Sequence, residues 1–223
     1  MFNSENIVNK TAYYSLGFQF LTGIIDVWGL QIKVPKDKEI FRDLLKVELG
    51  VQSVEFVFYS WMVYNFDKIE NITPYRYLDW VITTPTMLVT LMAYLDENKK
   101  GSLIDYIKEN KEIIIRVVSL NLVMLVLGLL GELNKIDYNF AILAGFIPFV
   151  YYFKIIYDKF ITKDTPKDKL YLFYFFLIVW SLYGVVAFLP YNEKNASYNI
   201  LDLFSKNLFG IFLVYILWTN RIK

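Results

Sequence analysis

Apolar runs of membrane-spanning length alternate with short polar clusters along the chain. About 20 predominantly apolar residues are enough for a helix to cross a bilayer. Pro74 suits the first turn of the third run. The sequence therefore predicts an all-α fold, a seven-transmembrane helix bundle that forms a single domain over residues 1–223. The expected helices cover residues 8–31, 43–66, 74–95, 112–133, 139–161, 170–190 and 197–219.

The composition supports a membrane protein and removes several classes of function. Hydrophobic residues make up 56% of the chain and the mean hydropathy is +0.38, which is too apolar for an ordinary soluble domain of this size. The formal net charge of +1 offers no broad basic field for nucleic acid. Histidine and cysteine are both absent, so the commonest catalytic base, the commonest metal ligand and all thiol chemistry are missing. We expect a protein that is not an enzyme and has no metal site.

Lysine and arginine residues are distributed unequally between the two ends of the expected bundle. Of the 23 basic residues, 17 fall in the connections and tail on one side, four fall on the other, and Arg76 and Lys206 lie within expected helices. Cytoplasmic loops of membrane proteins carry the excess of positive charge. This rule predicts an extracellular N-terminus and a cytoplasmic C-terminus.

The third and seventh expected helices carry charged residues inside their apolar runs. One face of the third helix has Arg76, Asp79, Thr83 and Thr90 at helical spacing. In the seventh helix Asp202 precedes Lys206 by one turn. A lysine in mid-membrane costs roughly 2.5–3.5 kcal/mol to insert, so it should be paired, covalently modified or facing water. A structural ion-pair network and a reactive amine are both open at this point.

Three motifs resemble the microbial (type 1) rhodopsins. RYLDW at residues 76–80, followed by TTP at residues 83–85, looks like the third helix of that family, and WSLY at residues 180–183 matches its retinal-sandwiching motif. Asp202 and Lys206 match its counterion and retinal lysine. The resemblance implies that Lys206 carries all-trans retinal as a protonated Schiff base. It also implies that Asp79 is the primary counterion and proton acceptor, with Asp202 as second counterion and Arg76 tying the pair towards the outside.

The same resemblance assigns a retinal pocket. Its expected residues are Trp80, Thr84, Met124, Gly128, Trp180 and Tyr183, with Gly145 and Phe149 as further neighbours of the ring end. Gly184 stands where pumps of the family commonly have proline. Thr84 and Asn121 form a pair that in the family's channels influences how long the open state lasts, and simple helix packing is the alternative for them.

Polar stripes run along the first two expected helices. Ser15, Gln19, Thr22 and Asp26 follow one stripe, and Glu48, Gln52, Glu55 and Tyr59 follow the other at the same spacing. Interhelical hydrogen bonding needs only one or two such residues. Two full stripes predict a hydrated path between the first, second, third and seventh helices, which its carboxylates would make selective for cations. The expected pore-lining residues are Gln19, Gln52, Glu55, Tyr59, Thr83 and Thr90.

The stripes resemble the group-1 viral rhodopsins of large DNA viruses, which are light-gated cation channels. Ser15, Glu48 and Asn207 match the central gate of that group in order and depth. We therefore expect a light-gated channel for monovalent cations and protons. The protein would lie among the lipids of the host cell's plasma or internal membrane, with its oligomeric state open. The alternative is an outward proton pump, although Thr90 stands where carboxylate-donor pumps have their donor; a photosensory rhodopsin is a third possibility.

Overall fold

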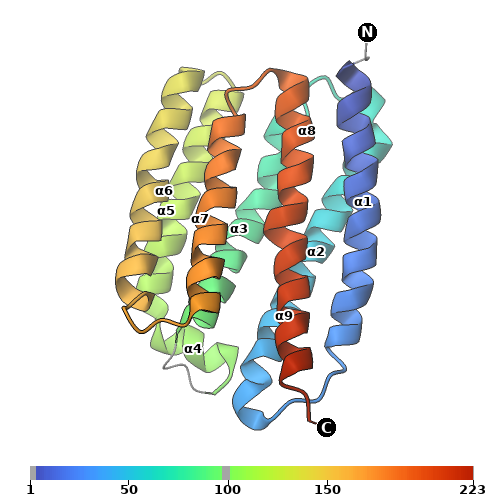
Figure 1. The fold of residues 1–223 in the computed structure, drawn as a ribbon. Helices are drawn as coiled ribbons and strands as arrows, with labels where there is room; N and C mark the ends of the chain where they lie inside the picture. The colour runs from blue at the N-terminus through green and yellow to red at the C-terminus, as the bar shows by residue number, and fades with distance from the viewer. Residues whose placement is uncertain (1–3, 97–100, 223) are drawn as a thin grey trace.

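The computed structural model describes residues 4–96 and 101–222. Within those ranges the chain forms helices joined by short connections and contains no strand (Figure 1). Long rods lie side by side, and the two ends of the chain lie at opposite ends of the bundle. The α-helices are α1 (Ser4–Gly29), α2 (Glu39–Asn65), α3 (Thr73–Leu95), α4 (Leu103–Glu109), α5 (Lys111–Glu132), α6 (Tyr138–Phe160), α7 (Lys167–Val186), α8 (Tyr191–Asp202) and α9 (Leu208–Thr219). Short 3₁₀ turns lie at Lys36–Lys38 and Phe66–Lys68.

The final rod is a single continuous helix in which α8 passes into α9 through η3 (Leu203–Asn207), a π-helical turn. The rod begins at Tyr191, directly after Pro190, and is therefore six residues longer at its start than expected. The preceding helix, α7, ends at Val186 rather than at residue 190. Since the residue before a proline is disfavoured in helical conformation, Pro190 separates these two rods. Single π turns often occur at functional sites.

The short helix α4 was not predicted, because it lies in a charged connection between two apolar runs. It begins with a capping box, in which Ser102 Oγ accepts from the backbone N–H of Asp105 and the Asp105 carboxylate accepts from the backbone N–H of Ser102. The hydrogen bonds from Ser102 lower the pKa of Asp105. Gly101, directly before, has a φ of 73° that favours glycine. These local signals were readable in the sequence.

Among the residues that the structure describes, five rods are long and apolar enough to cross a membrane: α3, α5, α6, α7 and the continuous rod Tyr191–Thr219. The polar stripes lower the hydropathy of α1 and α2, but the outer surface of α1 is apolar. Phe20, Leu21 and Ile24 are 54–59% exposed, whereas Gln19 and Asp26 are at most 2% exposed. Polar residues inside and apolar residues outside are the arrangement that lipid requires, so this is an integral membrane protein.

Candidate functional site

Lys206 lies at the centre of a buried charged cluster. Its side chain extends from η3 and is 2% exposed. Its ammonium contacts the carboxylate of Asp79 on α3, and lies 3.5 Å from Asp202 Oδ1 and 4.0 Å from Glu55 Oε1. The sequence placed Glu55 in the pore, and the structure brings it to the lysine as a third carboxylate. Since Arg76 and Lys206 are the two cations here, a shared proton among the three carboxylates would make the cluster neutral.

Arg76 is fully buried on the N-terminal side of α3, among polar residues from α8. Its Nε donates to Asn195 Oδ1 at 2.9 Å and one terminal nitrogen donates to Asn199 Oδ1 at 2.6 Å. Its other terminal nitrogen lies 3.6 Å from Asp202 Oδ2. Asn195 and Asn199 were missed from the sequence. They precede Asp202 at helical spacing, so their position on one face with Lys206 was the available signal.

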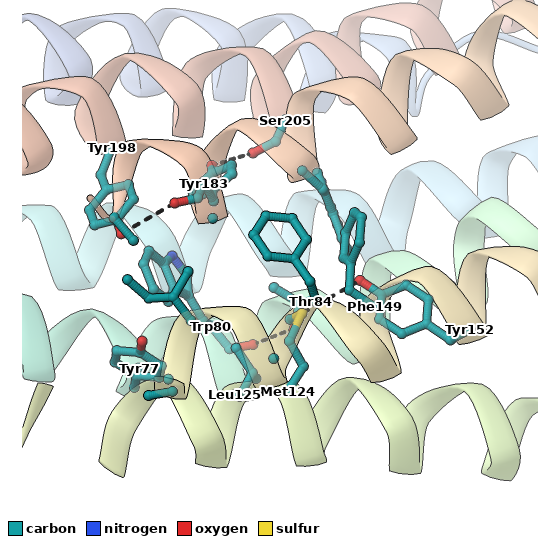
Figure 2. Close-up of a pocket in the computed structure, with 18 of the residues that line it drawn as sticks. Tyr77, Trp80, Thr84, Met124, Leu125, Phe149, Tyr152, Tyr183, Tyr198 and Ser205 are labelled. Atoms are coloured by element: carbon teal, nitrogen blue, oxygen red, sulfur yellow. Dashed lines mark hydrogen bonds between the residues drawn. The ribbon is translucent and has the colours of Figure 1, made fainter. Parts of the chain in front are cut away.

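Two tyrosines hold Asp202 in place. Tyr59 OH on α2 donates to Asp202 Oδ2, and Tyr183 OH on α7 donates to Asp202 Oδ1, both at 2.7 Å. Tyr183 also shares a 2.8 Å hydrogen bond with Ser205 (Figure 2). Asp202 therefore receives donors on both oxygens, whereas Asp79 Oδ1 and both oxygens of Glu55 receive no hydrogen bond from the described residues.

A largely apolar cavity opens beside Lys206 between α3, α5, α6 and α7. Figure 2 shows Trp80, Tyr183 and Tyr198 towards one end of it, and Phe149 and Tyr152 towards the other. All of the predicted pocket residues line it: Trp80, Thr84, Met124, Gly128, Trp180 and Tyr183, with Gly145 and Phe149. Lys206 is the one charged side chain in the wall. An elongated apolar molecule with a terminal carbonyl, such as retinal, fits this combination of aromatic faces and a single amine.

Two glycines allow aromatic rings to reach the wall of this cavity. A Cβ at Gly184 would collide with the ring of Phe146, coming within 2.7 Å of its Cε2 atom. A Cβ at Gly128 would lie 2.5 Å from the hydroxyl of Tyr77. Phe146 and Tyr77 were not identified from the sequence, because each is placed by packing between helices far apart in the chain. A side chain at Gly184 would therefore require the Phe146 ring to move.

The polar stripes of α1 and α2 face the interior. Ser15, Gln19, Thr22, Asp26, Glu48, Gln52, Glu55 and Tyr59 are all at most 3% exposed. The three expected gate residues have different hydrogen-bond partners. Ser15 Oγ donates to the backbone oxygen of Asn199, Glu48 accepts from Thr90, and Asn207 donates to Thr22 Oγ1. Among the residues described, no hydrogen bond joins any two members of that trio directly.

Residues of α3 connect this interior to neighbouring helices. Thr90 Oγ1 donates to Glu48 Oε1 at 2.5 Å. Thr84 Oγ1 donates to Asn121 Oδ1 on α5 at 2.9 Å, which joins the pair considered from the sequence. Thr83 is buried and donates to the backbone oxygen of Asp79 within its own helix. The third helix therefore meets both the polar stripes and the retinal-type cavity.

An all-helical membrane bundle with a buried lysine between carboxylates, beside an aromatic cavity, defines the class of microbial rhodopsins. The chain belongs to the bacteriorhodopsin-like protein family, whose model matches residues 10–220. It is 27% identical over 171 residues to a green-light absorbing proteorhodopsin from Gamma-proteobacterium EBAC31A08, a match that covers 68% of this chain and 62% of the relative. The match thus spans less than two thirds of the relative's length.

Solved structures show the same fold. The viral rhodopsin OLPVRII superposes with a TM-score of 0.81 at 25% identity, covering 95% of this chain and 98% of the other. Xanthorhodopsin, described as a light-driven ion pump with dual chromophore, superposes with a TM-score of 0.79 at 17% identity, covering 99% and 96%. The expected resemblance to microbial rhodopsins, and to viral ones in particular, is confirmed.

Proposed function

We propose that this protein is a light-gated channel for monovalent cations and protons, with all-trans retinal bound covalently to Lys206. Bound there, retinal would supply light absorption and a light-driven change of shape. The bundle crosses the membrane seven times, with an extracellular N-terminus and a cytoplasmic C-terminus. The unequal distribution of basic residues and the chain ends at opposite ends of the bundle support this topology (Figure 1).

Asp79 is the proton acceptor in this proposal. A lysine nitrogen that has condensed with an aldehyde keeps a single N–H, so it can donate to only one of the three nearby carboxylates. Asp79 is the one in direct contact. Its other oxygen receives no hydrogen bond from the described residues, whereas Asp202 is held by two tyrosines. Proton transfer to Asp79 would remove one charge of each sign and weaken the attraction between α3 and η3.

The observation that carries the channel proposal is an excess of buried acceptors along α1, α2, α3 and η3. Seven side-chain oxygens there receive no hydrogen bond from the described residues: Gln19 Oε1, Asp26 Oδ1, Glu48 Oε2, both oxygens of Glu55, Asp79 Oδ1 and Asn207 Oδ1. Buried acceptors without donors are expensive, and water or cations along a path would satisfy them. A stripe built only to hold helices together would pair its acceptors with donors. A hydrated path that passes cations explains the imbalance.

We propose that the pore-lining residues expected from the sequence line this path. Gln19, Gln52, Glu55 and Tyr59 lie on α1 and α2. On α3, Thr90 donates to Glu48 of α2, and Thr83 is buried. Ser15, Glu48 and Asn207 are proposed to gate it through rearrangement of their present hydrogen bonds. The path would lie in a membrane of the host cell.

An outward proton pump is the second candidate. The contact of Lys206 with Asp79 favours it, and so does similarity to xanthorhodopsin, which is described as an ion pump. Against it, Thr90 is engaged as a donor to Glu48 and has no dissociable proton near neutral pH. A photosensory role would use the same pigment and carry no current.

Recording photocurrent against voltage in cells expressing the protein with retinal separates these functions. A channel current should reverse near the cation equilibrium potential, and the reversal should move when sodium and potassium gradients are changed. An outward current that never reverses would refute the channel and support the pump. Lys206→Ala is the control, since it should abolish both visible absorption and photocurrent.

A further inference from the structure

One buried carboxylate along the proposed path has no role assigned to it so far. Asp26 lies near the end of α1 and is fully buried. Its Oδ2 accepts a 2.5 Å hydrogen bond from Gln52 Nε2, and its Oδ1 receives no hydrogen bond from the described residues. Leaving a buried carboxylate oxygen without a partner is costly, and a water molecule or a bound cation can supply that partner.

The C-terminal rod has a glycine where Asp26 approaches it. An ideal Cβ at Gly210 would collide with Asp26 Oδ2 and lie 2.5 Å from Gln52 Nε2. Any side chain there would displace the carboxylate or its partner. Gly50 on α2 offers a contrast, since no atom lies within 4 Å of an added Cβ. Gly210 therefore provides the space that the Asp26 carboxylate occupies.

Towards Lys206, Asp26 is covered by an amide plug, which we define as Gln52 and Asn207 with Thr22 between them. Gln52 Oε1 lies 3.4 Å from Thr22 Oγ1, which accepts from Asn207 Nδ2 at 3.1 Å. Asn207 is the residue after Lys206, on the same π turn. A movement of that turn would therefore break the plug directly.

Away from Lys206, Asp26 is covered by an apolar seal, which we define as Leu45 and Val214. Both pack against Gly29, one turn beyond Asp26. A Cβ at Gly29 would lie 2.5 Å from Val214 Cγ2 and 3.0 Å from Leu45 Cδ2. Apolar constrictions of this kind can close an ion path by excluding water.

We infer that Asp26 is a cation-binding carboxylate inside the closed path, located between the amide plug and the apolar seal. The inference rests on the proposed channel function and adds a site to it. When the plug opens, Gln52 releases Asp26, and both carboxylate oxygens can contact a dehydrated monovalent cation before it passes the seal. Carboxylate oxygens are the ligands that hard cations prefer.

The test uses the full chain with retinal, in whole-cell recordings with potassium chloride gradients. Asp26→Asn keeps the shape of the side chain and removes its charge. We expect the permeability of potassium relative to chloride to fall about tenfold, with the reversal potential moving towards zero and visible absorption unchanged. Asp43→Asn, in a surface pair with Lys46, is the control and should leave the reversal potential unaltered.

Gly210→Ala tests the same site without touching the carboxylate. Its methyl group should displace Asp26 and lower the selectivity in the same direction, whereas Gly50→Ala should have no effect. If Asp26→Asn does not form pigment, the comparison of Gly210→Ala with Gly50→Ala tests the inference. If Asp26→Asn and Gly210→Ala both give a reversing photocurrent with unchanged selectivity, the inference about Asp26 is overturned while the proposed channel function stands. A current that never reverses in the unmodified protein would overturn the proposed function, and this inference with it.

Discussion

The contact between Gly184 and Phe146 allows a test of how tightly the retinal-type cavity is built. In Gly184→Ala the new methyl group would overlap the Phe146 ring, and both residues line the cavity. Overpacking of this kind typically costs about 1–3 kcal/mol. Alanine is also a better helix former than glycine by about 1 kcal/mol, which works in the opposite direction. The steric cost must therefore be measured against a glycine that has space.

Gly17 on α1 provides that reference, since nothing lies within 4 Å of an added Cβ. Gly17→Ala should keep or slightly improve stability. Gly184→Ala should lose its visible colour faster on heating, by a factor of roughly 5–150 relative to Gly17→Ala, if the steric cost appears fully in the unfolding barrier. The assay is the rate of bleaching of purified pigment at a fixed temperature, which is appropriate for irreversible unfolding.

A compensating substitution tests the cause. Phe146→Leu removes part of the ring that the methyl group would meet, so Gly184→Ala combined with Phe146→Leu should bleach more slowly than Gly184→Ala alone. Equal bleaching rates for Gly184→Ala and Gly17→Ala would refute the argument. A double variant no better than Gly184→Ala would show that Phe146 is not the obstacle.

Two further predictions concern contacts at the ends and middle of the bundle. Lys194→Met should destabilise the pigment by about 3–5 kcal/mol. The lysine contacts the buried Glu132 carboxylate at 2.9 and 3.1 Å, and without it that carboxylate keeps the hydrogen bond from Tyr138 but has no counter-charge. Adding Glu132→Gln should recover much of that loss in the same bleaching assay, and a further loss would contradict the prediction. Thr84→Val removes the 2.9 Å hydrogen bond to Asn121 and should change the decay rate of the photocurrent about fivefold. Thr86→Val, which removes only an exposed bond to its own helix, is the control, and equal decay in both variants would exclude a kinetic role for the pair.

The charged residues of the third and seventh helices could be predicted from the sequence because helical periodicity places them on common faces. Arg76 and Asp79 are one turn apart, as are Asp202 and Lys206, so two helices define most of the cluster without knowledge of the other helices. The expensive burial of a lysine then required partners, and the structure provides them. Glu55 shows where this reasoning ends. Its face on α2 was evident, but which residues it meets depends on the rotation of α2 against the last rod.

The depth of residues on neighbouring helices was harder to predict than their faces. Ser15, Thr22 and Asp26 share one stripe of α1, and helical spacing alone offers no reason to prefer one of them as the partner of Asn207, although the family resemblance grouped Asn207 with Ser15. The structure pairs Asn207 with Thr22, because the tilt and axial position of α1 set which turn faces the π turn. A stripe therefore predicts that a helix lines an interior, while the level of each contact is a tertiary property.

Two glycines, Gly50 and Gly210, differ in what lies next to them. Gly50 faces open space, whereas Gly210 faces a buried carboxylate and its amide partner, yet both appear in the sequence as isolated glycines in helices. Glycine in a helix interior lowers the stability of the helix relative to alanine. Where nothing packs close to the glycine, closer packing does not offset that loss. At Gly210 the absence of a side chain makes space for Asp26. A charge at position 26 contributes little to stability, since an apolar side chain would pack there without leaving unpaired oxygens. The combination of a missing side chain on one rod and a half-satisfied carboxylate on the next is therefore better explained by ion passage than by helix association.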